Sequence, residues 1–132
     1  AELVKYAANI YLLRKVNLAS AIAAAAEKMG ANYENVRVGL AADRRIGDSH
    51  LDVGHGGYRG FGGFCFPKDL DAFIQFSKSA GLAHVSSMLE ADRTFNETVL
   101  AAQGLTLGDV SAHIDAVQDT LVERKTLNKT NR

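Results

Sequence analysis

The feature that most constrains this chain is a long N-terminal segment, residues 1–29, that contains neither proline nor glycine. The segment is rich in alanine, leucine, glutamate and lysine, which are among the residues with the highest helix propensities. We therefore predict one helix from Ala1 to Met29, ended by Gly30 and about 40 Å long. Apolar residues occur on almost every side of it, so it should be buried on most sides. In so small a chain, this predicts a homodimer that packs through the long helix.

The rest of the chain also reads as helices, with glycine-rich breaks between them. The predicted helices run from about Tyr33 to Ala42, from Pro67 to Ser79, from about Ala83 to Ala102, and from Leu107 to Arg124. Asn32 is the expected N-cap of the first of these, and Gly81 and Gly104 follow the second and third. Residues 48–59 read as loop and residues 125–132 as a polar tail. No strand pattern is visible, so the expected fold class is all-α.

The composition excludes several classes of partner. Lysine and arginine number 15, aspartate and glutamate number 15, and the resulting net charge of zero predicts no broad attraction to nucleic acid or to an anionic membrane. No apolar run reaches the length of a membrane span. One cysteine excludes an internal disulfide and suits a reducing cytoplasm. The chain begins within a helical pattern, which indicates a fragment or a separated domain.

The only cysteine and the only proline lie together in residues 60–69, Gly-Phe-Gly-Gly-Phe-Cys-Phe-Pro-Lys-Asp. Proline is favoured at the first position of a helix, so a helix should begin at Pro67, with Cys65 just ahead of it. A helix N-terminus favours an anion and the thiolate is the reactive form of cysteine, so Cys65 is a candidate nucleophile. The alternative is a small buried apolar residue. The three glycines of this stretch either let a ligand approach the backbone or only make a tight turn.

This stretch resembles the active-site cysteine motif of the UDP-glucose/GDP-mannose dehydrogenase family. The opening Ala-Glu-Leu-Val-Lys-Tyr-Ala-Ala-Asn resembles the start of that family's central domain, and Asp-Arg-Arg-Ile-Gly at residues 43–47 is similar to the segment between the two. The three motifs occur in the family's order, and the resemblance covers about Ala1 to Thr98. It is strongest to the UDP-glucose 6-dehydrogenases. It implies a central helical domain over residues 1–102, like the C-terminal domain of 6-phosphogluconate dehydrogenase, and leaves residues 103–132 as an unassigned helical extension.

The resemblance also implies a reaction, the NAD-dependent oxidation of a nucleotide sugar's primary alcohol to the acid, of the UDP-glucose to UDP-glucuronate type. Cys65 would capture the intermediate aldehyde as a thiohemiacetal and then hold the thioester. Asp69 would activate the water that releases the acid. Lys5 and Asn9, four residues apart and so on one face of the first helix, would stabilise the oxyanion. Without the resemblance, this pair reads as part of a solvated stripe.

The same resemblance assigns residues that bind the substrate. Phe61, Gly62 and Gly63 would line the sugar site. Arg45 would reach the nucleotide-sugar substrate of the neighbouring subunit, because a guanidinium fork suits phosphate oxygens. Read alone, Arg45 is a solvated charge at the end of a helix.

No cofactor or metal site is predicted within the chain. Residues 60–65 narrowly miss the dinucleotide pattern G-x-G-x-x-G, and no strand precedes them. We therefore expect NAD to be bound by domains absent from this chain, and the isolated chain to be inactive. Asp48, His50, Asp52 and His55 lie in a glycine-rich loop that does not supply the fixed, converging ligands a zinc site needs.

Two departures and two alternatives accompany this interpretation. Phe64 replaces the small residue that usually precedes the family's cysteine, and loop 48–59 is longer than the commonest family form. One alternative function is a helical dimerisation module without catalysis, which the missing cofactor domain would suit. The other is a cysteine hydrolase in which His50 or His55 activates Cys65.

Overall fold

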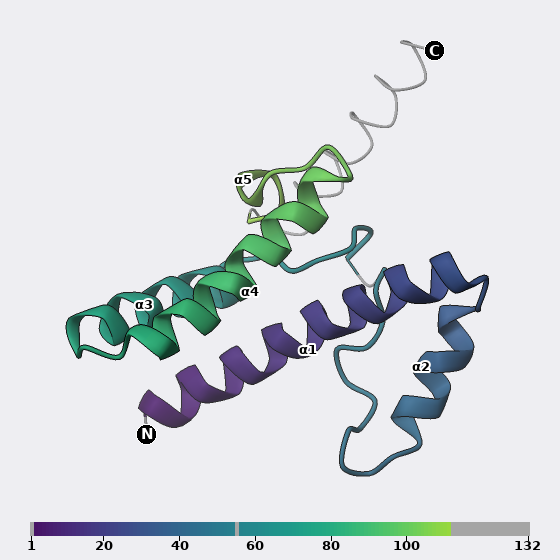
Figure 1. The fold of residues 1–132 in the computed structure, drawn as a ribbon, viewed down its shortest axis with the longest axis horizontal. Coiled ribbons are helices and arrows are strands. Elements are labelled where there is room, and N and C mark those ends of the chain that lie inside the picture. Colours follow the sequence, from purple (N-terminus) through teal and green to yellow (C-terminus); the bar gives the residue numbers. More distant parts are fainter. Residues whose placement is uncertain (1, 55, 112–132) are drawn as a thin grey trace.

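The computed structural model of the chain describes residues 2–54 and 56–111 as a set of helices (Figure 1). The five helices are α1 (Glu2–Met29), α2 (Tyr33–Ala41), α3 (Cys65–Ser79), α4 (Ala83–Ala101) and α5 (Leu107–Val110). No strand occurs in the part of the chain that the structure describes, so the all-α prediction is confirmed. The helix predicted over residues 107–124 is shorter than expected, because α5 ends at Val110. Residues 112–132, where the rest of that prediction and the polar tail fell, lie outside the described residues.

The long N-terminal helix is confirmed, but one chain does not bury it on most sides. α1 packs against α3 and α4 over its N-terminal and middle parts and against α2 near its C-terminal end (Figure 1). The buried side consists of Leu13, Asn17, Ala19, Ser20, Ala23 and Ala26. Five large apolar side chains of α1 are nevertheless exposed among the described residues: Leu3, Val4, Tyr11, Leu18 and Met29.

α3 and α4 form an antiparallel pair joined by a short turn at Gly81 (Figure 1). Gly81 has a φ of +74°, the left-handed conformation in which glycine commonly ends a helix. At the second helix, Asn32 is the predicted N-cap, and its side chain accepts a hydrogen bond of 2.8 Å from the backbone N–H of Glu34. No helix among the described residues is long and apolar enough to span a bilayer.

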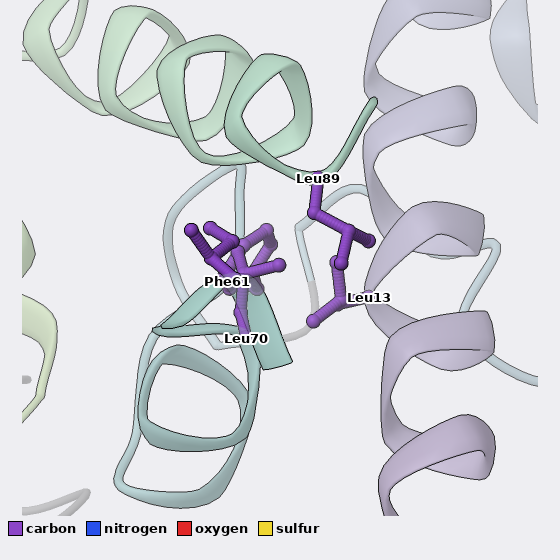
Figure 2. Close-up of a cluster of buried hydrophobic side chains, with 5 residues drawn as sticks. Leu13, Phe61, Leu70 and Leu89 are labelled. Carbon is purple, nitrogen blue, oxygen red and sulfur yellow. The ribbon is translucent and has the colours of Figure 1, made fainter. Parts of the chain in front are cut away.

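The main core lies where the three longest helices meet. Leu13 of α1, Leu70 of α3 and Leu89 of α4 converge there on Phe61, which comes from the loop before α3 (Figure 2). Ile74 of α3 completes the buried cluster. The loop that carries the cysteine motif is therefore anchored in the core through its first aromatic side chain.

A smaller cluster closes the other end of α4. Leu100, Leu105 and Val110 are buried there, with Tyr58 packed against them. α5 is fixed by a capping box, in which the side chains of Thr106 and Asp109 each accept a hydrogen bond from the other's backbone N–H. This cluster places Val110 beside the loop that leads to Cys65.

Candidate active site

α3 begins two residues earlier than the sequence indicated. Cys65 is its first helical residue and Phe64 its N-cap, so Pro67 occupies the third position rather than the first. The prediction failed because none of the first four N–H groups of a helix has a partner inside the helix, so proline fits any position of the first turn. Cys65 is thus part of the helix terminus rather than ahead of it, and its free thiol is exposed.

The loop before Cys65 is held by a side chain of α4. The Asn96 side chain accepts a hydrogen bond of 2.8 Å from the N–H of Phe61 and donates one of 2.9 Å to the Phe61 carbonyl. Both residues are buried, at 2% and 5% exposure respectively. The amide therefore pairs both backbone polar groups of a residue that water does not reach. Asn96 was missed by the sequence analysis, because an asparagine far along the chain carries no local signal of this contact.

At Gly60 and Gly62, two of the three glycines of the motif, the absence of a side chain lets other parts of the protein pack closely against the loop. Gly60 has a φ of +110°, and a Cβ there would lie 2.8 Å from Oδ1 of the Asn96 side chain. A Cβ on Gly62 would overlap the carbonyl oxygen of Val110 and lie 2.7 Å from the Tyr58 hydroxyl. Gly63, with a φ of +75°, has open space around its Cβ position, although its N–H donates a hydrogen bond of 2.7 Å to Val110. Of the three, only Gly63 leaves its side-chain position open to a ligand.

Two of the predicted site residues, Asn9 and Asp69, contact each other directly. Asp69 follows Cys65 by one helical turn, which places both on one side of α3. Its carboxylate is fully buried, and Oδ2 accepts a hydrogen bond of 2.6 Å from the Asn9 side-chain amide on α1. The second oxygen, Oδ1, has no hydrogen-bond partner among the described residues. A buried carboxylate oxygen without a hydrogen-bond partner retains lone pairs that can accept a proton from a water or substrate group placed beside it.

Lys68 is a neighbour that the sequence analysis did not single out. Its Nζ lies 3.9 Å from Asp69 Oδ1 and 5.1 Å from the centroid of the Phe64 ring. The Lys68 side chain is 49% exposed and that of Asp69 is 1% exposed, so solvent reaches only the lysine end of this pair. Phe64, the residue that departs from the family motif, thus gives the Lys68 ammonium a cation–π contact beside the cysteine. The spacing of three residues between Cys65 and Lys68 was the signal that could have revealed it.

The remaining predicted residues are not gathered around Cys65 by any hydrogen bond. Lys5 is exposed one turn before Asn9 and makes no hydrogen bond or ion pair within the described residues. Phe61 turns its ring into the core rather than into a pocket (Figure 2). Arg45 follows α2, and its guanidinium donates to Asp43. Hydrogen bonds from the guanidinium and the backbone of Arg45 lower the pKa of Asp43 below its ordinary value.

Of the two histidines in loop 48–59, only His50 lies within the described residues. The ring of His50 lies 6.0 Å from that of Phe66, the residue after Cys65, so this side of the loop approaches the site. His55 lies outside the described residues. No group of three potential metal ligands occurs among the residues that the structure describes. The hydrolase alternative is not tested by these contacts and stays a hypothesis.

Comparison with known proteins identifies the family. The sequence pattern of the UDP-glucose/GDP-mannose dehydrogenase family, central domain, matches residues 1–98. The chain belongs to this family. Its resemblance to the family, stated above from three motifs, is confirmed over the same residues. All the predicted site residues and Asn96 lie within the match, whereas Val110, which packs against the cysteine loop, lies beyond it.

Individual members of the family are similar to the chain over parts of their length. UDP-glucose 6-dehydrogenase TuaD of Bacillus subtilis is 46% identical over 81 residues, which are 61% of this chain and 17% of TuaD. UDP-glucose 6-dehydrogenase YwqF of the same organism is 42% identical over 77 residues, 58% of this chain and 17% of that protein. The UDP-glucose 6-dehydrogenase of Pseudomonas aeruginosa is 34% identical over 110 residues, 83% of this chain and 23% of that protein. The chain therefore spans less than a quarter of each relative.

Proposed function

We propose that the chain is the central domain of an NAD-dependent nucleotide-sugar 6-dehydrogenase of the UDP-glucose to UDP-glucuronate type. The observation that carries the proposal is the hydrogen bond between Asn9 and Asp69, one helical turn from an exposed Cys65. This bond links residues of two different motifs, which supports assigning them to one site. The names of the similar relatives, each a UDP-glucose 6-dehydrogenase, support the choice of substrate.

In this proposal, Cys65 acts on the aldehyde formed at the sugar's terminal carbon. The Cys65 thiolate attacks the carbonyl carbon, a C–S bond forms, and the carbonyl electron pair moves to the oxygen. NAD, when bound by the whole enzyme, would supply the acceptor for the hydride that leaves that carbon, so that Cys65 would hold the resulting thioester. Lys5 and the second N–H of the Asn9 amide are proposed to stabilise the oxyanion.

Hydrolysis of the thioester is assigned to Asp69. A water molecule loses a proton to the unpartnered oxygen Oδ1 as its own oxygen attacks the thioester carbonyl. The C–S bond then breaks, which releases the sugar acid and regenerates the Cys65 thiolate. Asn9 holds the other carboxylate oxygen throughout, so the accepting oxygen keeps its orientation. The Lys68 ammonium, 3.9 Å away, offsets part of the buried negative charge.

NAD is proposed to bind to parts of the enzyme outside this chain. The described residues contain no strand, whereas a dinucleotide fold needs a parallel sheet with a glycine-rich turn. The 132-residue chain alone is therefore expected to form no NADH from UDP-glucose. Steady NADH formation that Cys65→Ser abolishes would contradict this part of the proposal. We also propose a cytoplasmic location, because a free, exposed cysteine suits a reducing compartment.

UDP-glucose is expected to protect Cys65 from alkylation. The sugar's terminal carbon must lie beside Sγ for the proposed attack, so bound substrate should cover the thiol. Cys65 is the only cysteine, so the rate of iodoacetamide addition, followed by intact-mass spectrometry, reports on this site alone. We expect the rate to fall about tenfold or more at saturating UDP-glucose, in proportion to the bound fraction.

UDP at the same concentration is the control for this measurement, because it carries the same base and diphosphate without the glucose. Protection by both nucleotides would mean that a bound diphosphate is enough to cover Cys65 and that the glucose is not needed for protection. An unchanged alkylation rate with UDP-glucose, under conditions where its binding is detected, would remove the substrate assignment and favour the non-catalytic dimerisation module.

A homodimer built on α1 is the second part of the proposal. Tyr11 and Leu18 of α1 are each 61% exposed and border a groove between α1 and α4. The groove has a volume of about 630 Å³, and Met88 and Phe95 line its α4 side. An exposed apolar side of this kind on a helix of α1's length favours association with a second copy.

Light scattering is expected to give about twice the chain mass at micromolar concentration. Leu18→Glu places a charge in the groove and should shift the chain toward the monomer. The matched control is Val38→Glu, which changes another exposed apolar residue, on α2. A wild-type monomer, or equal dissociation by both substitutions, would contradict an interface on α1.

A further inference from the structure

The segment after α2 forms a short turn, residues 43–47, here called the Arg45 turn. The Asp43 carbonyl accepts hydrogen bonds of 3.0 Å from the N–H of Ile46 and 2.9 Å from that of Gly47. The Asp43 side chain accepts a further bond of 2.9 Å from the N–H of Arg45. Gly47 has a φ of +75°, which suits glycine and closes the turn. The backbone that carries Arg45 is therefore fixed within its own sequence.

The Arg45 side chain is fixed as well, although it is 90% exposed. Nε donates to Asp43 Oδ1 at 3.0 Å, and Nη2 donates to Oδ2 at 2.7 Å, so the pair is bidentate. Within the described residues Nη1 has no hydrogen-bond partner. Because the guanidinium is planar, a pair that occupies one edge leaves the Nη1–Nη2 edge facing solvent with two parallel N–H donors.

The turn is tied to the long helix by a lysine. Lys15 of α1 donates from Nζ to the Ile46 carbonyl at 2.7 Å and to the Ser49 hydroxyl at 3.3 Å. Lys15 is half-buried, and its contacts join α1 to the segment after α2. The helix that carries Asn9 thus also sets the position of Arg45.

We propose that Lys15 and Asp43 are positioning residues for Arg45, holding its free guanidinium edge toward the diphosphate of a nucleotide sugar. This inference rests on the proposed function and on the expectation from the family resemblance that Arg45 reaches the nucleotide-sugar substrate of the neighbouring subunit. Its physical basis is preorganisation, because a long exposed side chain that is already ordered loses less rotamer freedom on binding. Asp43 orients the Arg45 guanidinium, but its own negative charge would repel the diphosphate. The effect of removing that charge on affinity therefore tests whether orientation or repulsion dominates.

The ordering of Arg45 is testable without ligand, by ¹⁵N relaxation of arginine Nε–H groups in the whole chain. We expect an order parameter for Arg45 near that of rigid backbone, about 0.85, and a value below about 0.6 for the exposed neighbour Arg44. Asp43→Asn should lower the order parameter of Arg45 toward that of Arg44. Equal mobility of the two arginines in the wild-type chain would overturn the proposal.

Binding of UDP-glucose, followed by titration calorimetry or ligand-observed NMR, gives the second test. Lys15→Met and Asp43→Asn are each expected to weaken binding about threefold to tenfold, and Lys15→Arg, which keeps a donor for Ile46, should restore it. The controls are Lys28→Met on the exposed end of α1 and Asp71→Asn, which breaks another exposed ion pair. Circular dichroism establishes that each variant is folded.

The outcomes separate this inference from the proposed function. If Arg45→Ala weakens binding but Lys15→Met and Asp43→Asn do not, the positioning role is wrong and the function stands. Tighter binding by Asp43→Asn would likewise overturn the positioning role, because charge repulsion would then dominate. If Arg45→Ala has no effect, or the wild-type chain does not bind UDP-glucose, the expectation that Arg45 binds this substrate is wrong, and this inference is wrong with it.

Discussion

Replacing Asn96 by alanine is expected to lower the free energy of unfolding by about 2–4 kcal/mol. The substitution leaves the N–H and the carbonyl of Phe61 buried without partners, and each such group costs about 1–3 kcal/mol. It also opens a void next to Gly60, whose Cβ position lies 2.8 Å from the Asn96 oxygen. Urea denaturation followed by circular dichroism measures the change.

Asn35→Ala is the matched control for this prediction, because Asn35 is an exposed helical asparagine of α2. It should change the free energy of unfolding by no more than about 0.5 kcal/mol. The two variants also differ in where they act, since only Asn96 holds the loop that precedes Cys65. A loss below about 1 kcal/mol for Asn96→Ala would mean that water reaches the Phe61 backbone and that the loop is not anchored in this way.

The helices were predictable because their signals are local. The absence of proline and glycine before Gly30 is enough to predict α1, and the Asn32 side chain caps α2 at the predicted residue. The start of α3 was misplaced for an equally local reason. Proline tolerates every position of a first turn, so Pro67 marks the turn but not the residue at which it begins.

The packing of the cysteine loop was not predictable, because its partners are distant in sequence. From the sequence, Gly60 and Gly62 were interpreted as allowing either a ligand to approach or a tight turn. The structure shows instead that they allow Asn96 and Val110 to approach the loop closely. Nothing in the local sequence of either residue indicates that it touches a glycine in the cysteine loop. The exposed apolar side of α1 was a similar case, since periodicity shows which residues are apolar but not which neighbours cover them.

The candidate site was predictable in part. The spacing of Cys65 and Asp69 places them one turn apart on any helix, so their proximity follows from the sequence once α3 is recognised. The contact of Asn9 with Asp69 does not, because it depends on how α1 crosses α3. The family resemblance implied a role for Asn9 beside Cys65 but not this contact. Asn9 was expected to face the oxyanion, whereas one of its N–H groups is already bound to Asp69.

The second large effect concerns the release of an acyl group from Cys65. Asp69→Asn removes the carboxylate proposed to take the proton from water, so hydrolysis of a Cys65 thioester should slow about 100-fold or more. Asparagine keeps the size of the side chain and can still accept a hydrogen bond from Asn9 after rotation of its amide. Because Asp69 is fully buried, the fold of the variant must be compared with that of the wild type by circular dichroism.

The most direct test of this account is a single-turnover measurement of deacylation. p-Nitrophenyl acetate transfers its acetyl group to Cys65 with release of p-nitrophenolate, and intact-mass spectrometry then follows the loss of the acetyl group to water. We expect no acylation of Cys65→Ser, fast release from the wild-type chain, and slow release from Asp69→Asn, with Asp71→Asn, on the same helix, behaving as wild type. Equal release rates from wild type, from Asp69→Asn and from the urea-unfolded chain would contradict a hydrolytic site at Cys65 and Asp69.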